Sequence, residues 1–300
     1  MPKTISYTYF LHIRVIFMKA YLDCIPCFVR QSLEAARMAT DDEDIHREVL
    51  DKVMKDLREN SLEGKKPPDI ADRVHYIVRK LTNGTDPYKK MKEKQNESAM
   101  YFYPQLKSMV SDSNDRLYTA VKLAISGNII DLAPGHEINL EESVKQVLNQ
   151  DLEIDHFNKF KEELDKAENI FYLADNAGEI AFDKVLLEEL DEKNVTFFVK
   201  GGPIINDAME EDADYVGISE LAEIDVVSNG MPGTGPKRDS EEFIKRMGDA
   251  DMVISKGQGN YEALSEVDRN IFFLLKAKCP VIANDLDVDV GSLILKQTSF

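Results

Sequence analysis

The feature that most constrains the fold is the stretch of residues 169–207, in which two apolar runs flank a helical pattern. The runs 170–174 and 195–199 have the length of buried strands, and the apolar residues between them recur every three to four positions. Strand, helix and strand in this order form a right-handed crossover, which joins two parallel strands of one sheet. The stretch therefore predicts an α/β fold with a parallel sheet.

The same alternation continues toward the C-terminus, whereas the chain before residue 166 has the apolar periodicity of helices. The further runs expected to form strands are 224–228, 251–255, 280–283 and 292–296. We therefore expect a mostly parallel sheet with helices on both faces, preceded by a helical domain in which Pro104 kinks or breaks a long helix. The expected division is an N-terminal extension of residues 1–17, a helical domain of residues 18–165 and an α/β domain of residues 166–300.

Residues 1–17 are apolar enough to suggest a signal peptide. His12 and Arg14 interrupt the apolar run, however, and no cleavage site of small residues follows it. We therefore interpret Met18 as the start of the folded protein, with a short N-terminal strand or arm as the alternative.

Composition narrows the classes of function. A net charge of -18 disfavours a nucleic-acid surface, because contacts to the phosphate backbone need clustered Lys and Arg. Three cysteines are too few for a disulfide scaffold and indicate a reducing compartment, so a cytoplasmic location is expected. No uncharged run approaches the roughly 20 residues of a membrane span. A small phosphorylated substrate is compatible with this negative net charge, because one or two local lysines can bind it.

Polar side chains directly follow the first two predicted strands. Asp175, Asn176 and Glu179 follow the first strand, and Lys200 and Asp207 follow the second. Because the carboxyl ends of parallel strands meet at one edge of a sheet, these groups can converge on one crevice. Carboxylate and amide oxygens suit Mg²⁺ or Mn²⁺, so Asp175, Asn176 and Asp207 are candidate metal ligands. Helix capping by Asp175 and Asp207 is an equally good explanation at this point.

A second candidate feature follows the run 251–255. Lys256 stands between this apolar run and the loop Gly-Gln-Gly-Asn, where a lysine can reach a phosphate. The backbone N–H groups of the loop and the N-terminus of the next helix supply further donors. We therefore expect Lys256, Gly257 and Asn260 to bind an anion.

Cys24 and Cys27 leave several interpretations open. Their CxxC spacing suits a redox pair or half of a metal site, but a zinc site needs about four ligands and Cys279 is the only other cysteine. Packing of two cysteines at a helix end is an equally good explanation. The five histidines precede the sheet region and stand in no motif, which disfavours Ser–His or Cys–His nucleophilic catalysis.

Several spaced motifs together resemble a known family. They are LADNAGE, KGGPIINDA, SNG, SKGQGNYE and SGNIIDL. With the N-terminal CxxC they are similar to the metal-dependent damage-control phosphatases, formerly domain of unknown function 89, in their prokaryotic and archaeal branch. The resemblance covers nearly all of the chain from Met18 onward. It implies a Rossmann-like three-layer α/β/α domain with an N-terminal helical domain, and a divalent metal ion (Mn, Ni, Mg or Co) at the strand ends.

The resemblance also implies roles for individual residues. The family's metal ligands correspond to Asp175, Asn176 and Asp207, and its phosphate-contacting lysine corresponds to Lys256. A family asparagine near the substrate corresponds to Asn128 in SGNIIDL.

A second lysine of the family corresponds to Lys278. In other branches this lysine belongs to an RTxK motif, and the stretch here reads LKAK, without the Arg and the Thr.

The expected function is hydrolysis of phosphomonoesters in small metabolites, either sugar phosphates or nucleotides, including damaged ones. Asp175 and Lys256 are the expected catalytic residues, and Glu179 is a further expected substrate contact. The attacking group is either metal-bound water or the carboxylate of Asp175.

Two other functions stay open. One is an S-adenosylmethionine-dependent carboxyl methyltransferase, an activity also proposed within the family. The other is a non-enzymatic nucleotide-binding or redox module built on Cys24 and Cys27. The only partner expected is the small phosphorylated substrate, with neither nucleic acid nor membrane.

Overall fold

The computed structural model describes residues 18–84, 86–127, 140–190, 192–227, 243 and 245–298. The expected extension 1–17, the motif SNG and Asn128 lie outside these ranges.

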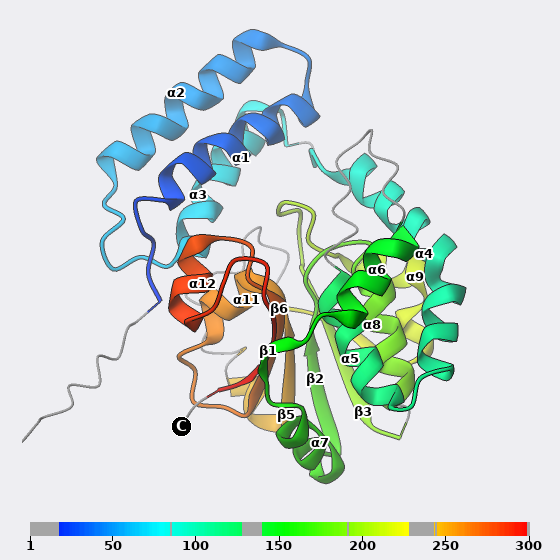
Figure 1. The fold of residues 1–300 in the computed structure, drawn as a ribbon. Helices are drawn as coiled ribbons and strands as arrows, with labels where there is room; N and C mark the ends of the chain where they lie inside the picture. Colours follow the sequence, from blue (N-terminus) through cyan, green and yellow to red (C-terminus); the bar gives the residue numbers. More distant parts are fainter. Residues whose placement is uncertain are drawn as a thin grey trace, which may run out of the picture.

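The described chain is built on a seven-stranded sheet with the order β1-β7-β6-β5-β2-β3-β4 (Figure 1). The strands are β1 (Leu152–Asp155), β2 (Asn169–Leu173), β3 (Asn194–Val199), β4 (Glu223–Val226), β5 (Met252–Lys256), β6 (Ile271–Lys276) and β7 (Leu293–Gln297). Neighbouring strands are parallel except β6 and β7, which are antiparallel. The expected α/β fold with a mostly parallel sheet is therefore confirmed.

The predicted crossover is present at the centre of the sheet. Helix α8 (Ile180–Leu187) connects β2 to β3, and the two strands pair in parallel from Ile170 with Val195 to Leu173 with Phe198. On its other side β2 pairs with β5. From β2 the chain continues to β3 on one side of β2, whereas β5, which comes later in the chain, lies on the other side. The carboxyl end of β2 is therefore the topological switch point of the sheet, where such sheets bind ligands.

One predicted strand is wrong. Residues 280–283 begin helix α12 (Pro280–Leu286), in which Pro280 occupies the first turn. Proline is favoured there, because its missing N–H has no partner in the first turn of any helix. The strand at this point of the sheet is β6, a run of apolar residues that the prediction did not include. The short strand β1 was also not expected.

Helices cover both faces of the sheet. On one face, residues of α4 to α9 pack with the sheet in one hydrophobic cluster. These helices are α4 (Lys89–Ser111), α5 (Arg116–Ser126), α6 (Leu140–Asn149), α7 (Phe157–Lys166), α8 and α9 (Glu210–Val216). On the other face, α11 (Gly257–Leu264) and α12 belong to a second cluster. In the described ranges no helix is long and apolar enough to span a membrane.

Helix α4 continues through Pro104, so of the predicted kink or break the break is wrong and the kink stays a prediction. A proline inside a helix costs about 3 kcal/mol, because it removes a hydrogen bond and crowds the preceding turn. Phe102 and Leu106, on either side of Pro104, are buried in the cluster that includes the sheet. We infer that this packing offsets the cost of the proline.

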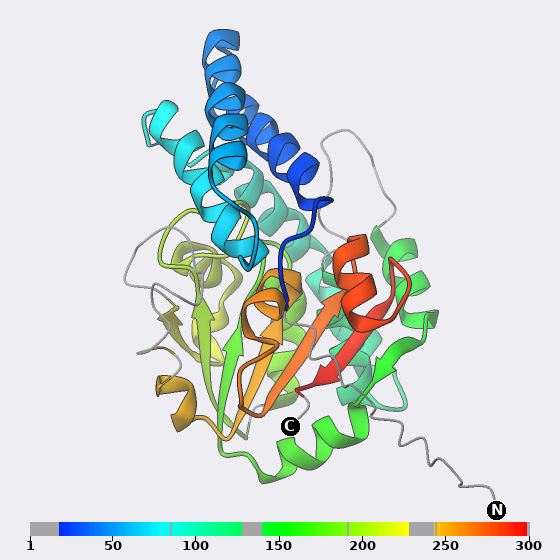
Figure 2. The ribbon, with the colours of Figure 1, turned by 90° about the vertical axis from the view of Figure 1, so that its left-hand side faces the viewer.

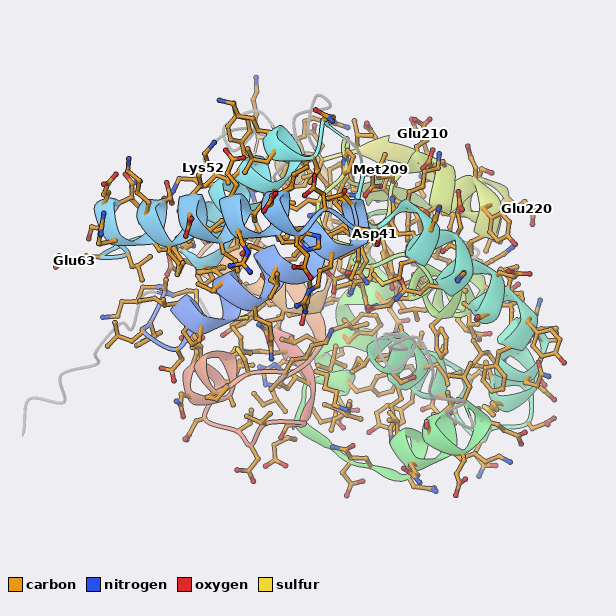
Figure 3. The ribbon with its side chains drawn as sticks, turned by 90° about the horizontal axis from the view of Figure 1, so that it is seen from above. Asp41, Lys52, Glu63, Met209, Glu210 and Glu220 are labelled. Carbon is orange, nitrogen blue, oxygen red and sulfur yellow. The ribbon has the colours of Figure 1, made fainter. Side chains whose placement is uncertain are left out.

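Helices α1 (Cys24–Ala39), α2 (Glu43–Glu59) and α3 (Pro67–Leu81) form a third hydrophobic cluster of their own. They lie above the end of the sheet toward which the parallel strands point (Figure 2). Seen from above, α2 extends from near the labelled Asp41, over the middle of the molecule, to near the labelled Glu63 at its edge (Figure 3). Lys66, just before α3, pairs with Glu266 at 3.2 Å and so links these helices to the segment after α11.

The expected domain boundary near residue 166 stays a prediction. The hydrophobic clusters group the chain differently, because α4, α5 and α6 pack against the sheet while α1, α2 and α3 pack with one another. Strand β1 also joins the sheet from a position before residue 166.

Candidate active site

Two neighbouring loops bring the three predicted metal ligands together. One loop follows β2 and carries Asp175 and Asn176, and the other follows β3 and carries Asp207. Asn176 and Asp207 form an isolated antiparallel bridge, and the N–H of Ala208 donates to the carbonyl of Asp175 at 2.8 Å. Backbone pairing therefore fixes these ligand positions relative to each other.

Helix capping does not explain the two aspartates. Helix α8 begins after Glu179 and helix α9 begins after Met209, so neither Asp175 nor Asp207 occupies an N-cap position. The capping alternative left open by the sequence is therefore wrong for both residues.

The carboxylates in this region form an acidic cluster. Burial raises the pKa of Asp175 well above its usual range, and the nearby Glu179 and Asp207 raise it further, against Lys278 and Lys200. Burial also raises the pKa of Asp207, which Lys200 opposes. The ionised carboxylates are thus short of compensating positive charge, which a divalent cation would supply.

The donor set fits a hard divalent ion. The side-chain nitrogen of Asn176 donates to Asp175 Oδ2 at 2.9 Å and to Glu179 Oε2 at 3.2 Å, which leaves the amide oxygen as a ligand. With Asp175 and Asp207 this gives three oxygen donors. No group of three His, Cys, Asp or Glu side chains in the described ranges forms a metal cluster by itself, and an amide completes the predicted set.

Lys256 of the SKGQGNYE stretch lies in a buried cluster of charged groups. Its side chain is fully buried, and its ammonium lies 2.7 Å from Glu179 Oε1 and 2.6 Å from Asp183 Oδ1. Burial lowers the pKa of Lys256, but Asp183 and Glu179 raise it by more, so the ammonium stays charged. Tyr172 donates to the same Asp183 oxygen at 2.8 Å. Lys256 therefore compensates the charge of two buried carboxylates.

A cavity of about 470 Å³ opens beside the acidic cluster. Its wall is formed by the two ligand loops, by α1 and the start of α3, and by the first turns of α11 and α12. The predicted site residues that line it are Asp175, Asn176, Asp207, Asn260 and Lys278. Glu179, Lys256 and Gly257 are not among the lining residues.

Lys200 is a cavity residue to which sequence reasoning assigned no role. Its ammonium lies 3.7 Å from Asp207 Oδ2 and 3.4 Å from Asn260 Oδ1. Asn260 in turn donates to the carbonyls of Ala174 and Lys256, which ties the start of α11 to the end of β2. The signal in the sequence was the position of Lys200, directly after an apolar strand.

Gly257 allows α11 to approach the ligand loop. Its φ is +80°, and a Cβ at this position would lie 2.0 Å from Asp175 Oδ2. A glycine is therefore required at this point both for its backbone conformation and for space.

All of the chain's cysteines line the cavity. Cys24 and Cys27 lie in the first turn of α1, and Cys279 is the N-cap residue of α12. Burial raises the pKa of Cys24, and Gln258 donates to Cys279 Sγ at 3.4 Å. The three thiols are free in this structure. Their position in the cavity wall was not foreseen, because the sequence does not show how α1 sits over the sheet.

A mostly parallel sheet with buried carboxylates, lysines and a cavity at its switch point is the arrangement in which α/β proteins bind small ligands. Comparison with known proteins makes the class specific. Residues 20–294 match the family model of the damage-control phosphatase ARMT1-like domain.

Curated relatives and a solved structure agree with this match. A damage-control phosphatase from Pyrococcus horikoshii is 37% identical over 288 residues, which are 94% of this chain and 99% of that protein. A damage-control phosphatase from Archaeoglobus fulgidus is 34% identical over 282 residues, 91% of this chain and 97% of that protein. The crystal structure of a protein of the former domain-of-unknown-function 89 family from P. horikoshii has a TM-score of 0.84 and 36% identity, covering 94% of this chain and all of that one.

The chain belongs to the damage-control phosphatase family with the ARMT1-like domain, and it is a phosphatase. The family predicted from the motifs is thereby confirmed, whereas its CxxC-containing prokaryotic and archaeal branch stays a prediction. The methyltransferase alternative is not favoured, because these two curated relatives are named phosphatases. The family is in general metal-dependent, which agrees with the oxygen ligands described above.

Proposed function

We propose that the protein hydrolyses small phosphorylated metabolites with a divalent ion held by Asp175, Asn176 and Asp207. The observation that supports this most is the convergence of these side chains on two paired loops at the wall of one cavity. Mg²⁺ and Mn²⁺ bind through one or two carboxylates together with substrate phosphate, and this arrangement leaves room for that phosphate.

The bound ion would supply Lewis-acid polarisation of a phosphate oxygen. Lys200 and Lys278 line the same cavity and would neutralise charge on the remaining oxygens. We assign them the direct phosphate contact expected of Lys256, because Lys256 is fully buried between two carboxylates. Asp175 is one of only two carboxylates in the proposed donor set, so we infer that it holds the metal and that water, not Asp175, attacks phosphorus.

The cavity sets the size of the substrate. Small-molecule sites have volumes of about 300–1,000 Å³, and about 470 Å³ accommodates a sugar phosphate or a nucleotide. Apolar groups such as Phe28 and Pro67 and polar groups such as Gln31 line the part contributed by α1 and α3. We therefore propose that these helices contact the part of the substrate that is not phosphate.

Removal of metal tests this proposal. After treatment with EDTA and dialysis, hydrolysis of a panel of sugar phosphates and nucleotides should fall to background. It should return when Mg²⁺, Mn²⁺, Co²⁺ or Ni²⁺ is added, measured as released inorganic phosphate. Undiminished turnover by protein shown to be metal-free, or no turnover of any phosphoester with any of these ions, contradicts the proposal.

A further inference from the structure

We propose that Asn96 of helix α4 is a positioning residue that clamps both loops carrying the metal ligands. The inference rests on the proposed metal site. It concerns a buried hydrogen-bond network that lies outside the cavity and has no part in the mechanism described above.

The first contact of Asn96 is with the loop after β2. Its Oδ1 accepts a hydrogen bond from the N–H of Gly178 at 2.6 Å, two residues after Asn176. Gly178 has a φ of +75°, and a Cβ there would lie 2.9 Å from the Cβ of Gln95. The loop therefore packs directly on the backbone of α4 and is held there by one side chain.

The second contact of Asn96 leads to the loop after β3. Its Nδ2 donates to Asp212 Oδ1 at 2.8 Å. The other oxygen of Asp212 accepts from the N–H of Met209 at 2.9 Å, two residues after Asp207, and from Lys92 Nζ at 3.1 Å. The side-chain amide of Asn96 thus connects both loops, because its oxygen accepts from Gly178 and its nitrogen donates to Asp212.

The network is buried, so its loss is not repaired by solvent. The exposed fractions are 1% for Lys92, 3% for Asn96 and 4% for Asp212. Without the amide, the N–H of Gly178 and one oxygen of Asp212 lose their partners, and the two loops lose their common support. Metal–ligand distances must be met within about 0.2 Å, so a small displacement of either loop weakens metal binding.

The test measures metal binding in the absence of substrate. Asn96→Ala should bind Mn²⁺ about 10- to 100-fold more weakly than the wild type, as is typical when the support of a ligand is removed. Free Mn²⁺ can be followed by electron paramagnetic resonance. The matched control is Tyr103→Phe on the same helix, which removes a 2.7 Å hydrogen bond to Glu188 away from the ligand loops. It should bind Mn²⁺ like the wild type.

An unchanged Mn²⁺ affinity in Asn96→Ala overturns the proposal, even if its thermal midpoint falls. If Asn96→Ala does not fold, Asn96→Ser tests the same contact, because it is uncharged and too short to reach Gly178 and Asp212 at once. Failure of the metal site itself gives a different result: the wild type then binds no Mn²⁺, or Asp207→Ala binds it equally well.

A separate observation concerns a carboxyl group in the cavity wall. We infer that Glu262 of α11 is the general acid that protonates the leaving-group oxygen. Glu262 lines the cavity and is 8% exposed. Gln258, one turn earlier, donates to Glu262 Oε1 at 3.2 Å. In the described ranges no Lys, Arg or His forms an ion pair with Glu262, so the hydrogen bond from Gln258 is not reinforced by a paired cation.

The surroundings of Glu262 favour the protonated form. Burial raises its pKa to about 7, against the hydrogen bond from Gln258, and Asp285 of α12 raises it further. The other titratable groups on the elements around it are the thiols of Cys24 and Cys27 on α1 and Cys279 at α12, the ammonium of Lys278 next to Cys279, and that of Lys66, which donates to the carbonyl of Ala263 at 3.1 Å. In the described ranges neither ammonium forms an ion pair with Glu262, and Lys66 pairs with Glu266 instead.

The step assigned to Glu262 is a single proton transfer. Water attacks phosphorus and releases one of its protons to solvent, while the bond between phosphorus and the leaving oxygen breaks with its electron pair on that oxygen. The oxygen takes the proton of Glu262, which leaves a carboxylate that solvent reprotonates. The products are an alcohol and inorganic phosphate. This inference also rests on the proposed function, because it requires hydrolysis of a phosphomonoester.

Leaving-group dependence tests the role of Glu262. Glu262→Gln should lose about 10²- to 10⁴-fold in kcat on the best sugar phosphate found in the screen above. It should lose little on p-nitrophenyl phosphate, because nitrophenolate departs without a proton. In the wild type, kcat/KM for the sugar phosphate should fall as the pH rises through about 7, where Glu262 loses its proton.

Equal losses on both substrates, or no loss on either, overturn this role. A structural effect of the substitution lowers both rates together, whereas a lost proton donor lowers only one. If the wild type hydrolyses neither compound, the failure lies in the proposed function and not in the assignment of Glu262.

Discussion

Replacing Asp207 with alanine is expected to reduce metal-dependent phosphate hydrolysis by more than about 100-fold. Loss of a group that merely orients a metal ligand typically costs about 10- to 100-fold in affinity or activity, so loss of a ligand itself should cost more. Asp207 supplies one of the two carboxylates in the proposed donor set, and Asn176 opposite it cannot replace that charge. Rates of phosphate release at several Mn²⁺ concentrations measure the loss.

The same variant should remain folded. Burial raises the pKa of Asp207, so its ionised form is less stable in the folded than in the unfolded protein at neutral pH. Its removal should therefore not lower the thermal midpoint of the metal-free protein. Asp165→Ala, which removes an exposed aspartate from α7, is the control for activity and stability. Wild-type turnover by Asp207→Ala would rule out this residue as a ligand.

The central crossover was predictable from sequence because its signals are local. Two apolar runs separated by a helical period determine β2, α8 and β3, and parallel pairing then places Asp175 and Asp207 at one edge. Strand β6 was missed because the neighbouring residues 280–283 are also apolar. Periodicity cannot separate a short buried helix from a short buried strand.

The direction of the Lys256 side chain was harder to predict. Side chains two positions apart in a strand share a face of the sheet, so Lys256 follows Ile254. Ile254 is buried in the cluster on the α8 face, and Asp183 of α8 meets the ammonium there. The alternation was visible in the sequence, but which helix covers that face was not. The same holds for Cys24 and Asn96, because their positions depend on how distant helices pack.

Replacing Gly257 with alanine should disturb both the fold and the metal site. A left-handed backbone costs an L-residue other than glycine roughly 1–2 kcal/mol, equivalent to a fall of roughly 2–8 °C in the thermal midpoint. In addition, the new Cβ would lie 2.0 Å from Asp175 Oδ2, so either the carboxylate or the start of α11 must move. We therefore expect a larger fall in the thermal midpoint than strain alone gives, together with loss of Mn²⁺ binding.

Two glycine variants separate these causes. Gly64 has a φ of +66° and no atom within 4 Å of a built Cβ, so Gly64→Ala carries the backbone strain alone. Gly259 lies within α11 and also has no atom within 4 Å, so Gly259→Ala should leave the thermal midpoint unchanged or slightly raised. If Gly257→Ala loses no more stability than Gly64→Ala and keeps its Mn²⁺ affinity, close contact with Asp175 is not what requires glycine. A loss of Mn²⁺ binding confined to Gly257→Ala would instead show that α11 and the ligand loop share one tightly packed contact at Asp175.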